Sequence, residues 1–305
     1  GGHRVPCFLY WPEGGLGSPL DVDGLTEVQD ILPTLIDLCG LDAAETAFDG
    51  MSLAPVLRGE RAVPEERMLA VNYSRMPRFD YPSPDSEAVM RREGAAVMWK
   101  HWRLLESVAL YDLRNDTAQQ HNVIERYPEV ARTMEAALDA WWADVEPVAN
   151  QVQRIIIGSD EENPMMLTAC EWRDVFVDQQ KQVRVGVRKN SHWHLDVARA
   201  GTYRFELRRW PRESGPDGKG LRLTAACTAT ELTDGYLDEG VALPIARARM
   251  MIDRTWYTQA VGPDDRAAVF TVALEAGPTL LHTWFDDARG DALCGAYYVY
   301  VARVG

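Results

Sequence analysis

Beyond Pro147 the sequence breaks into short stretches in which apolar and polar residues alternate, and this pattern restricts the fold more than any other feature of the chain. In "HWHLDVARAGTYRFELRRWP" every second residue from Trp193 to Val197 is apolar, and the alternation resumes at Tyr203. A period of two places alternate side chains on opposite faces of a strand. We therefore predict two strands joined by a turn at Ala200-Gly201, and we interpret them as a hairpin.

Further stretches of this kind follow, separated by turn-forming residues. They span 221–231, 245–252, 267–274, 279–285 and 296–303. The sequence "GPDGKG" from Gly215 to Gly220 is expected to form an exposed loop. About eight strands at this spacing predict an all-β sandwich or jelly roll over residues 148–305.

The first 58 residues have a different pattern, which predicts one strand followed by one helix. Val5–Trp11 is mostly apolar, as expected of a strand that is buried on both faces. In "LTEVQDILPTLIDLCG" apolar residues recur at helical spacing, and Gly40 is placed to end the helix. We expect Thr26 to cap one tight turn and Pro33 to lie in the first turn of the following helix, where a missing N–H costs little.

Residues 59–147 are predicted to form a small α+β unit with an antiparallel sheet. The segments "RMLAVNYS", "AAVMWKHWRLLES" and "ALYDL" have the composition of strands. Apolar residues recur every three or four positions from Pro128 to Val145, and proline suits the first position of a helix. We expect this helix to pack on the sheet.

The overall charge excludes some classes of partner. The 305 residues carry a formal net charge of -14, which argues against nucleic acid as a partner, because phosphate backbones require a surplus of Lys and Arg. No apolar run approaches the ~18 residues of a membrane-spanning helix, so we expect no membrane partner. The five cysteines show no CxxC spacing, so neither a zinc site nor a disulfide framework is indicated. The compartment stays open, and a periplasmic or extracellular location is compatible with the sequence.

A series of motifs in the first 147 residues carries a family resemblance. In order, these are "GGHRVP", "WPEG", "EVQDILPTLIDLCGL", "DGMSLAPVLRGE", "WKHWRLLES", "LYDLRND" and "QQHNV" with "YPEV". Together they resemble the C-terminal half of the sulfatase family, the arylsulfatase-like branch of the alkaline phosphatase superfamily. One loop departs from the family pattern, because Thr117 and Gln119 stand near the places where the family usually has Pro and Glu.

The resemblance implies a division into three parts. Residues 1–58 would end an α/β catalytic domain of the alkaline phosphatase type, residues 59–147 would form its C-terminal α+β subdomain, and residues 148–305 would be an accessory β-sandwich. It further implies hydrolysis of sulfate monoesters by a formylglycine, made from Cys or Ser in a Cys/Ser-x-Pro/Ala-x-Arg motif, together with a Ca²⁺ ion held by Asp and Asn.

This chemistry has no counterpart in the sequence at hand. No Cys or Ser has the required context, and the first lysine is Lys100, whereas the family's substrate-contacting lysine precedes the Gly-Gly pair. We therefore expect the nucleophile, the metal ligands and the missing N-terminal half of the catalytic domain to lie upstream of Gly1. The chain alone should contain no catalytic residue, bind no cofactor and be inactive.

The resemblance leaves five residues as candidates for the substrate pocket. His3 and Arg4 follow the Gly-Gly pair and could face an anionic substrate; the alternative is that Arg4 is structural. Arg75, Arg78 and His101 lie in the part that often shapes the substrate entrance in sulfatases; the alternative is a solvated surface.

Two features of the predicted sandwich have both a functional and a structural interpretation. His192 and His194 alternate on one strand and therefore share a face, as two metal ligands would, or as a solvent-facing pair would. The domain is also rich in aromatic residues, which either stack on sugar rings or fill the core. These residues are Trp172, Trp193, Trp210, Trp256, Trp284, Tyr297, Tyr298 and Tyr300.

We conclude from the sequence that the chain is the C-terminal part of a bacterial-type sulfatase whose parent enzyme acts on a sulfated small molecule or a sulfated glycan. One alternative is a phosphonate or phosphate monoester hydrolase of the same superfamily. Another is a non-enzymatic carbohydrate-binding protein built on the sandwich.

Overall fold

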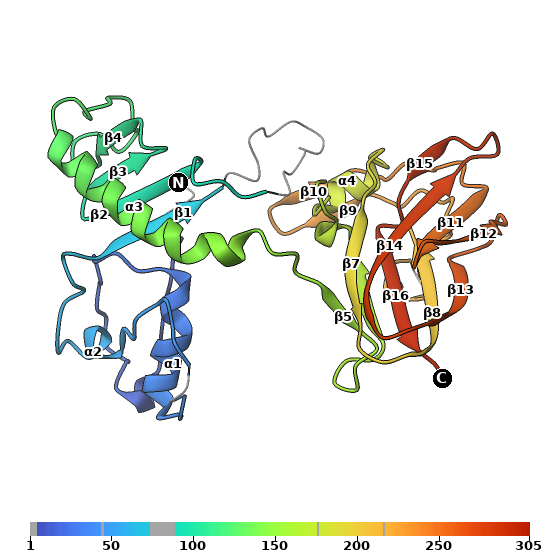
Figure 1. Cartoon of the computed structure of the whole chain (residues 1–305), viewed down its shortest axis with the longest axis horizontal. Coiled ribbons are helices and arrows are strands. Elements are labelled where there is room, and N and C mark those ends of the chain that lie inside the picture. The colour runs from blue at the N-terminus through green and yellow to red at the C-terminus, as the bar shows by residue number, and fades with distance from the viewer. Residues whose placement is uncertain (1–4, 44–45, 74–88, 176, 216) are drawn as a thin grey trace. The chain divides into compact units, whose positions relative to one another are not determined.

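The computed structural model describes residues 5–43, 46–73, 89–175, 177–215 and 217–305. The chain forms two compact units (Figure 1). The first contains Gly1–Ser74 and Arg91–Pro147, and the second contains Arg75–Met90 and Val148–Gly305. In the described parts of both units, none of the helices combines the length and the hydropathy needed to cross a membrane.

The first unit contains a four-stranded antiparallel sheet covered by one long helix. The strands are β1 (Met68–Asn72), β2 (Ala95–Trp99), β3 (Trp102–Leu105) and β4 (Ala109–Asp112), in that spatial order. The helix α3 (Pro128–Ala149) begins at the proline, as predicted, and runs along the sheet (Figure 1). Met134 and Leu138 of α3 are buried against Leu104 and Leu110 of the sheet.

The segment predicted as one strand over 95–107 is two strands. Lys100 adopts a left-handed conformation (φ 51°), and the chain reverses there, so that Trp99 pairs with Trp102. The sequence does not mark this turn, since Lys100 and His101 stand where Gly, Pro or Asn would be expected.

The N-terminal part of this unit contains the predicted helix. A 3₁₀ turn, η2 (Val28–Asp30), leads into α1 (Ile31–Cys39), and a short helix, α2 (Ala54–Leu57), follows. Two predictions are confirmed, because Pro33 lies in the first turn of α1 and Gly40 ends the helix in a left-handed conformation. The predicted cap is displaced by one residue: Glu27, not Thr26, forms the capping box with Asp30.

The prediction of a strand over Val5–Trp11 is wrong for this structure. The segment is irregular, apart from the short 3₁₀ turn η1 (Pro12–Gly14) after it and a bridge between Trp11 and Leu16. A strand needs neighbours for its N–H and C=O groups, and the described residues provide none here. Its side chains are consequently exposed, reaching 94% for Phe8.

A buried carboxylate connects three segments of the first unit. Asp30 is fully buried, and its carboxylate accepts hydrogen bonds from the Glu27 amide (2.9 Å), the Met51 amide (2.8 Å) and Arg67 Nη2 (2.7 Å). The chain approaches so closely at Gly50 that a Cβ atom there would lie 2.2 Å from the Gln29 carbonyl oxygen. The connection therefore joins the start of α1, the segment before α2 and the entry to β1.

The second unit is a β-sandwich. One sheet has six strands in the order β12-β11-β14-β7-β5, with β15 paired to β14; the other has four in the order β13-β8-β16-β6. The bounds are β5 Ile155–Ile157, β6 Met165–Thr168, β7 His192–Val197, β8 Gly201–Arg208, β11 Arg247–Ile252, β12 Thr255–Ala260, β13 Ala268–Leu274, β14 Gly277–Asp286, β15 Ala292–Cys294 and β16 Tyr298–Arg303. A separate pair, β9 (Thr230–Leu232) and β10 (Gly235–Leu237), and two short helices, η3 (Ala169–Glu171) and α4 (Gln180–Arg184), complete the unit.

The predicted strands at 192–197 and 201–208 exist, but the hairpin does not. The strand β7 pairs with β14 and β5, whereas β8 pairs with β13 and β16 in the other sheet. The chain therefore crosses between the sheets at Ala200-Gly201. Inward residues of both strands, such as Trp193 and Phe205, meet in one core, in which each is fully buried.

The predicted strand at 221–231 is also wrong. Only its last residues join a strand, β9, and the remainder is irregular. Here side chains replace the neighbouring strand: the Ala225 carbonyl accepts hydrogen bonds from Arg209 Nη1 and Trp210 Nε1, both at 3.1 Å. The strands predicted near 245–252, 267–274, 279–285 and 296–303 correspond to β11, β13, β14 and β16.

We expect Asp30→Asn to open the first unit locally. Arg67, whose side chain is 11% exposed, would lose a buried charge partner, and breaking such a pair costs about 3 kcal/mol. Hydrogen exchange at the Met51 and Leu53 amides should therefore accelerate, while Asp23→Asn, at an exposed position, should have no effect. Burial opposes ionisation of Asp30, but the Arg67 and backbone hydrogen bonds lower its pKa overall.

The lowered pKa of Asp30 predicts how hydrogen exchange at the Met51 amide depends on pH. A carboxylate with a lowered folded-state pKa stabilises the fold above its unfolded pKa of about 3.9 and loses that effect as the pH falls through the folded value. Protection of Met51 should therefore persist below pH ~4 in the parent chain. Equal protection in the parent and Asp30→Asn at neutral pH would contradict the role of this carboxylate.

Candidate functional site

Of the five candidate pocket residues, His3, Arg4, Arg75 and Arg78 lie outside the described residues. Their roles remain predictions. His101 is described, and it lies in the turn between β2 and β3.

His101 sits beside the loop that follows β4. Its carbonyl oxygen accepts the Leu113 amide at 2.9 Å, and its Nε2 atom is buried and lies 3.9 Å from Asp112 Oδ1, beyond hydrogen-bond distance. Burial lowers the pKa of His101, and the positive charge of Arg114 lowers it further, while Asp112 acts in the opposite direction. The imidazole is therefore held in its neutral form.

Asp112 organises this loop. Its carboxylate accepts Arg114 Nε (3.1 Å), Arg114 Nη2 (3.0 Å) and Asn115 Nδ2 (3.1 Å). The hydrogen bond from the Arg114 side chain is the main reason why the pKa of Asp112 falls to about 2. A neutral imidazole, a carboxylate and an exposed guanidinium thus lie together, which suits the orientation of an anionic group but provides no nucleophile.

The described residues do not fit the cofactors that the sulfatase resemblance implies. No group of three or more His, Cys, Asp and Glu side chains within them is arranged to hold a metal ion. No Cys or Ser anywhere in the sequence lies in a formylglycine motif. The catalytic chemistry of a sulfatase is therefore not assigned to any residue of this structure.

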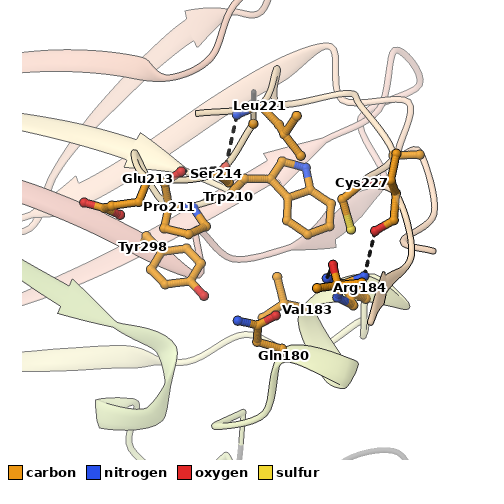
Figure 2. A pocket seen from close by; sticks show the side chains of 14 residues that line it. Gln180, Val183, Arg184, Trp210, Pro211, Glu213, Ser214, Leu221, Cys227 and Tyr298 are labelled. Atoms are coloured by element: carbon orange, nitrogen blue, oxygen red, sulfur yellow. Dashed lines mark hydrogen bonds between the residues drawn. The ribbon is translucent and has the colours of Figure 1, made fainter. Parts of the chain in front are cut away.

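The second unit contains a cavity of about 670 Å³ at one end of the sandwich (Figure 2). Trp210 and Leu221 lie on one side, Tyr298 on another, and Gln180 and Val183 of α4 opposite Trp210. Figure 2 shows the Tyr298 hydroxyl and the Gln180 amide turned toward the opening and the Glu213 carboxylate turned away from it. The lining is thus mainly apolar with a few polar groups, as in sites for small organic ligands.

One buried arginine, Arg184, lines this cavity, and a second, Arg209, lies behind the lining residue Trp210. Arg184 donates to the Thr228 carbonyl (3.0 Å), the Asp238 carbonyl (2.7 Å) and Thr230 Oγ1 (2.8 Å), and so holds the β9–β10 segment at the rim. Arg209 is fully buried and stacks at 4.5 Å on Trp210, the residue that lines the cavity. Burial lowers the pKa of Arg209. Within the described residues neither guanidinium forms an ion pair: neutral oxygens accept from both, the Trp210 ring lies against Arg209, and the buried Nε atom of each has no hydrogen-bond partner.

A second cluster occupies the outer face of the six-stranded sheet. His192 and His194 of β7 and His282 and Trp284 of β14 point to this face, since their neighbours in the strands are inward. The His282 ring lies 3.9 Å from Trp284, and Trp284 stacks at 4.9 Å on Trp256 of β12. These rings, carried by β7, β14 and β12, form a row that crosses four strands, because β11 lies between β14 and β12.

The charge of Arg249, on β11 between the two tryptophans, affects the nearest histidine of this row. Arg249 lies 5.0 Å from the Trp284 ring and is held by Asp286, which accepts its Nε at 2.6 Å and its Nη2 at 2.9 Å. Burial, with the charges of His192 and Arg249, lowers the pKa of His282 to about 4. Burial also lowers the pKa of His192 and of His194. Each of these shifts disfavours the charged form of the imidazole.

The structure separates the aromatic residues into two groups. Trp172, Trp193, Trp210, Tyr297 and Tyr300 are buried, as core residues are. Trp256 is 53% exposed, and Trp284 and Tyr298 are half-buried. This division could not be predicted from the sequence, because the residues around Trp256 show no alternation that would assign it to a face of a strand.

The comparisons with known proteins give partial matches. No family model matches the chain. A stretch of 101 residues, 33% of this chain, is 34% identical to steryl-sulfatase from Mus musculus, of which it covers 14%. A stretch of 70 residues, 23% of this chain, is 39% identical to arylsulfatase G from Homo sapiens, of which it covers 13%. The matches thus span a small part of each relative.

Solved structures resemble the chain weakly. A family 35 carbohydrate-binding module, "CBM35 from Cellvibrio japonicus Abf62", covers 47% of this chain and 93% of that chain with 12% identity and a TM-score of 0.24. A ruminal GH26 endo-beta-1,4-mannanase covers 47% of this chain and 26% of that chain with 10% identity and a TM-score of 0.27. Likenesses of this strength carry no argument about function.

We expect the His101 pKa to respond in opposite directions to two substitutions. Asp112→Asn removes a negative charge and should lower it further, whereas Arg114→Ala removes a positive charge and should raise it. NMR titration of the His101 ring measures both shifts. Shifts of the same sign in the two variants would contradict the electrostatic arrangement of this loop.

Proposed function

We propose that this chain, part of which is related to the sulfatases, is the C-terminal part of a sulfuric ester hydrolase. The observation that carries the proposal is the 34% identity over 101 residues to a steryl-sulfatase, with further partial matches to arylsulfatase G. The order of the sequence motifs supports it. At the level of the family, the relationship indicates a hydrolase.

An exposed apolar surface on the first unit supports the view that the catalytic domain extends beyond these residues. Ile31, Leu32 and Leu35 of α1 are 46%, 58% and 43% exposed, and the irregular segment from Val5 to Trp11 exposes further apolar side chains. Burial of a fully exposed side chain of this kind contributes ~1.5 to 3 kcal/mol, so each of the three half-exposed residues of α1 would gain about half of that. We assign the remainder of an alkaline-phosphatase-like α/β domain as the structure that covers this surface.

In this proposal the reacting groups lie in that remainder. The formylglycine would supply the nucleophile and Ca²⁺ would stabilise the charge that develops on the sulfate oxygens. His101 and the Asp112–Arg114 pair would lie at the substrate entrance, together with His3, Arg4, Arg75 and Arg78. The substrate would be a sulfated small molecule or a sulfated glycan.

The test compares this chain with the product of the full reading frame that contains it. We expect the chain alone to release no sulfate from 4-methylumbelliferyl sulfate, and the longer product to release it. Parallel assays with a phosphate monoester and a phosphonate ester distinguish the related hydrolases of the superfamily. Sulfate release by the chain alone, abolished by His101→Ala, would overturn the proposal, as would a full reading frame without the formylglycine motif.

A second candidate function is carbohydrate binding by the sandwich. The specific observation that favours it is Trp256, which is 53% exposed, stacks on Trp284 and lies 5.7 Å from the Arg249 guanidinium. An exposed indole beside a cation suits contact with a sugar ring that carries an anionic substituent.

Affinity electrophoresis in gels with sulfated or neutral polysaccharides tests this candidate. If Trp256 binds the polymer, Trp256→Ala should weaken retardation about fivefold, which corresponds to ~1 kcal/mol of stacking. Tyr236→Ala, at a residue of β10 that is 70% exposed, is the matched control and should change nothing. Replacing Trp193 is uninformative, because this residue is fully buried in the core. Equal retardation of the parent and Trp256→Ala would exclude this role of Trp256.

A further inference from the structure

The sandwich brings together three histidines that lie far apart in the sequence. His192 and His194 are two residues apart on β7, and His282 of β14 pairs directly with His192. All three are partly accessible on the outer face of the six-stranded sheet. The centroids of the His192 and His194 rings are 4.9 Å apart, and those of His192 and His282 are 6.0 Å apart.

Two ring nitrogens converge on one point. The Nε2 atoms of His192 and His194 are 3.2 Å apart, although the residues stand about 6.8 Å apart along an ideal strand. Two nitrogens that each lie 2.0–2.1 Å from one tetrahedral zinc ion are separated by about 3.3 Å. The observed separation therefore fits a shared ion without movement of the backbone.

We propose that His192 and His194 form a binding site for a divalent transition-metal ion of the zinc, nickel or copper class, on the outer face of the six-stranded sheet. Imidazole is a preferred ligand of these metals, whereas Ca²⁺ and Mg²⁺ prefer oxygen ligands. Water completes the coordination, because no group of three ligating side chains is found among the described residues. The proposal does not depend on the sulfatase assignment.

The surrounding structure holds both ligands in place. The strand β7 is hydrogen-bonded to β14 on one side and to β5 on the other, and Trp193 and Leu195 between the ligands are fully buried. Ser191 Oγ lies 3.4 Å from His192 Nδ1. A hydroxyl there can accept a hydrogen bond from Nδ1–H, which leaves the Nε2 lone pair directed at the metal; metal-bound histidines usually donate their other N–H in this way.

Coordination of the metal by both Nε2 atoms requires no net release of a proton. At 3.2 Å, two neutral imidazoles share one Nε2–H···Nε2 hydrogen bond, in which one ring carries the proton on Nε2. When the metal binds, this proton moves through solvent to the Nδ1 atom of the same ring, and both Nε2 lone pairs coordinate the ion. Nothing is oxidised or reduced.

His282 forms one wall of the site and is not assigned as a ligand. Its ring packs against Trp284, and its Nε2 atom is buried without a hydrogen-bond partner. The carboxylate of Asp174, on the segment before β7, interacts favourably with both ligands, whereas Arg173 and Arg154 repel a cation. The nearby charges therefore favour a cation at His192 and oppose it at His194, and the proposal depends on the two nitrogens.

Calorimetric titration of the whole chain with ZnCl₂, NiCl₂ and CuCl₂ tests the site. We expect one ion per chain, and we expect His192→Ala and His194→Ala each to weaken binding by more than about tenfold. Asp196→Ala, on the same face of β7, and His121→Ala, at an exposed position of the first unit, are matched controls that should bind as the parent does. Near-ultraviolet circular dichroism verifies that each variant retains the fold.

Long-range ¹H–¹⁵N NMR of the imidazoles provides a second readout that is independent of affinity. Zinc should shift the Nε2 resonances of His192 and His194 and leave that of His282 within its free range. Absence of binding would overturn the proposal. Equal binding by the parent and both ligand variants would mean an adventitious ion only and would also overturn it. A loss of affinity in His282→Ala as large as in His194→Ala would overturn the assignment of two protein ligands.

Discussion

The described structure depends on carboxylates that are buried and neutralised by arginine. Asp30 in the first unit and Glu206 and Asp286 in the second are each less than 5% exposed. Asp30 is held by Arg67, Asp286 by Arg247 and Arg249, and Glu206 by Arg204, Arg208 and Arg212. An unpaired charge in such a position would be too costly to bury, so each pair fixes the segments that carry it. The guanidinium forms paired hydrogen bonds that lysine cannot form, which accounts for the use of arginine at these places.

The periodicities of the sequence predicted the elements better than their connections. The alternation from Trp193 to Leu207 identified the inward residues of β7 and β8, since a residue that faces the core is apolar whichever sheet contains it. For the same reason it did not distinguish a hairpin from a crossing between sheets. Strand pairing is decided by contacts with residues more than 60 positions away, such as Phe270 opposite Phe205, and a local pattern contains no record of them.

The candidate sites could also be predicted only in part, because they depend on contacts between distant residues. The shared face of His192 and His194 follows from a period of two, but the neighbouring His282 lies on a strand whose pairing was not predicted. Likewise, the two arginines at and behind the cavity lining could not be recognised as buried, because the carbonyl oxygens that solvate them belong to irregular segments. In the first unit, the motifs of the sulfatase resemblance include Asp112 and Arg114. The distance of 3.9 Å between His101 Nε2 and Asp112 Oδ1, however, is a property of the folded loop.

The position of β16 has a consequence for how the sandwich is made. This strand, Tyr298–Arg303, comes last in the chain and lies between β8 and β6 in the interior of its sheet. During synthesis, β8 ends 90 positions, and β6 130 positions, before the start of the strand that joins them (298 − 208 and 298 − 168). The four-stranded sheet cannot close until translation has passed β16, so the earlier strands must await it in a partly assembled state, and slow, non-local closure of this kind is the interval in which a nascent sandwich is most exposed to chaperones and to self-association.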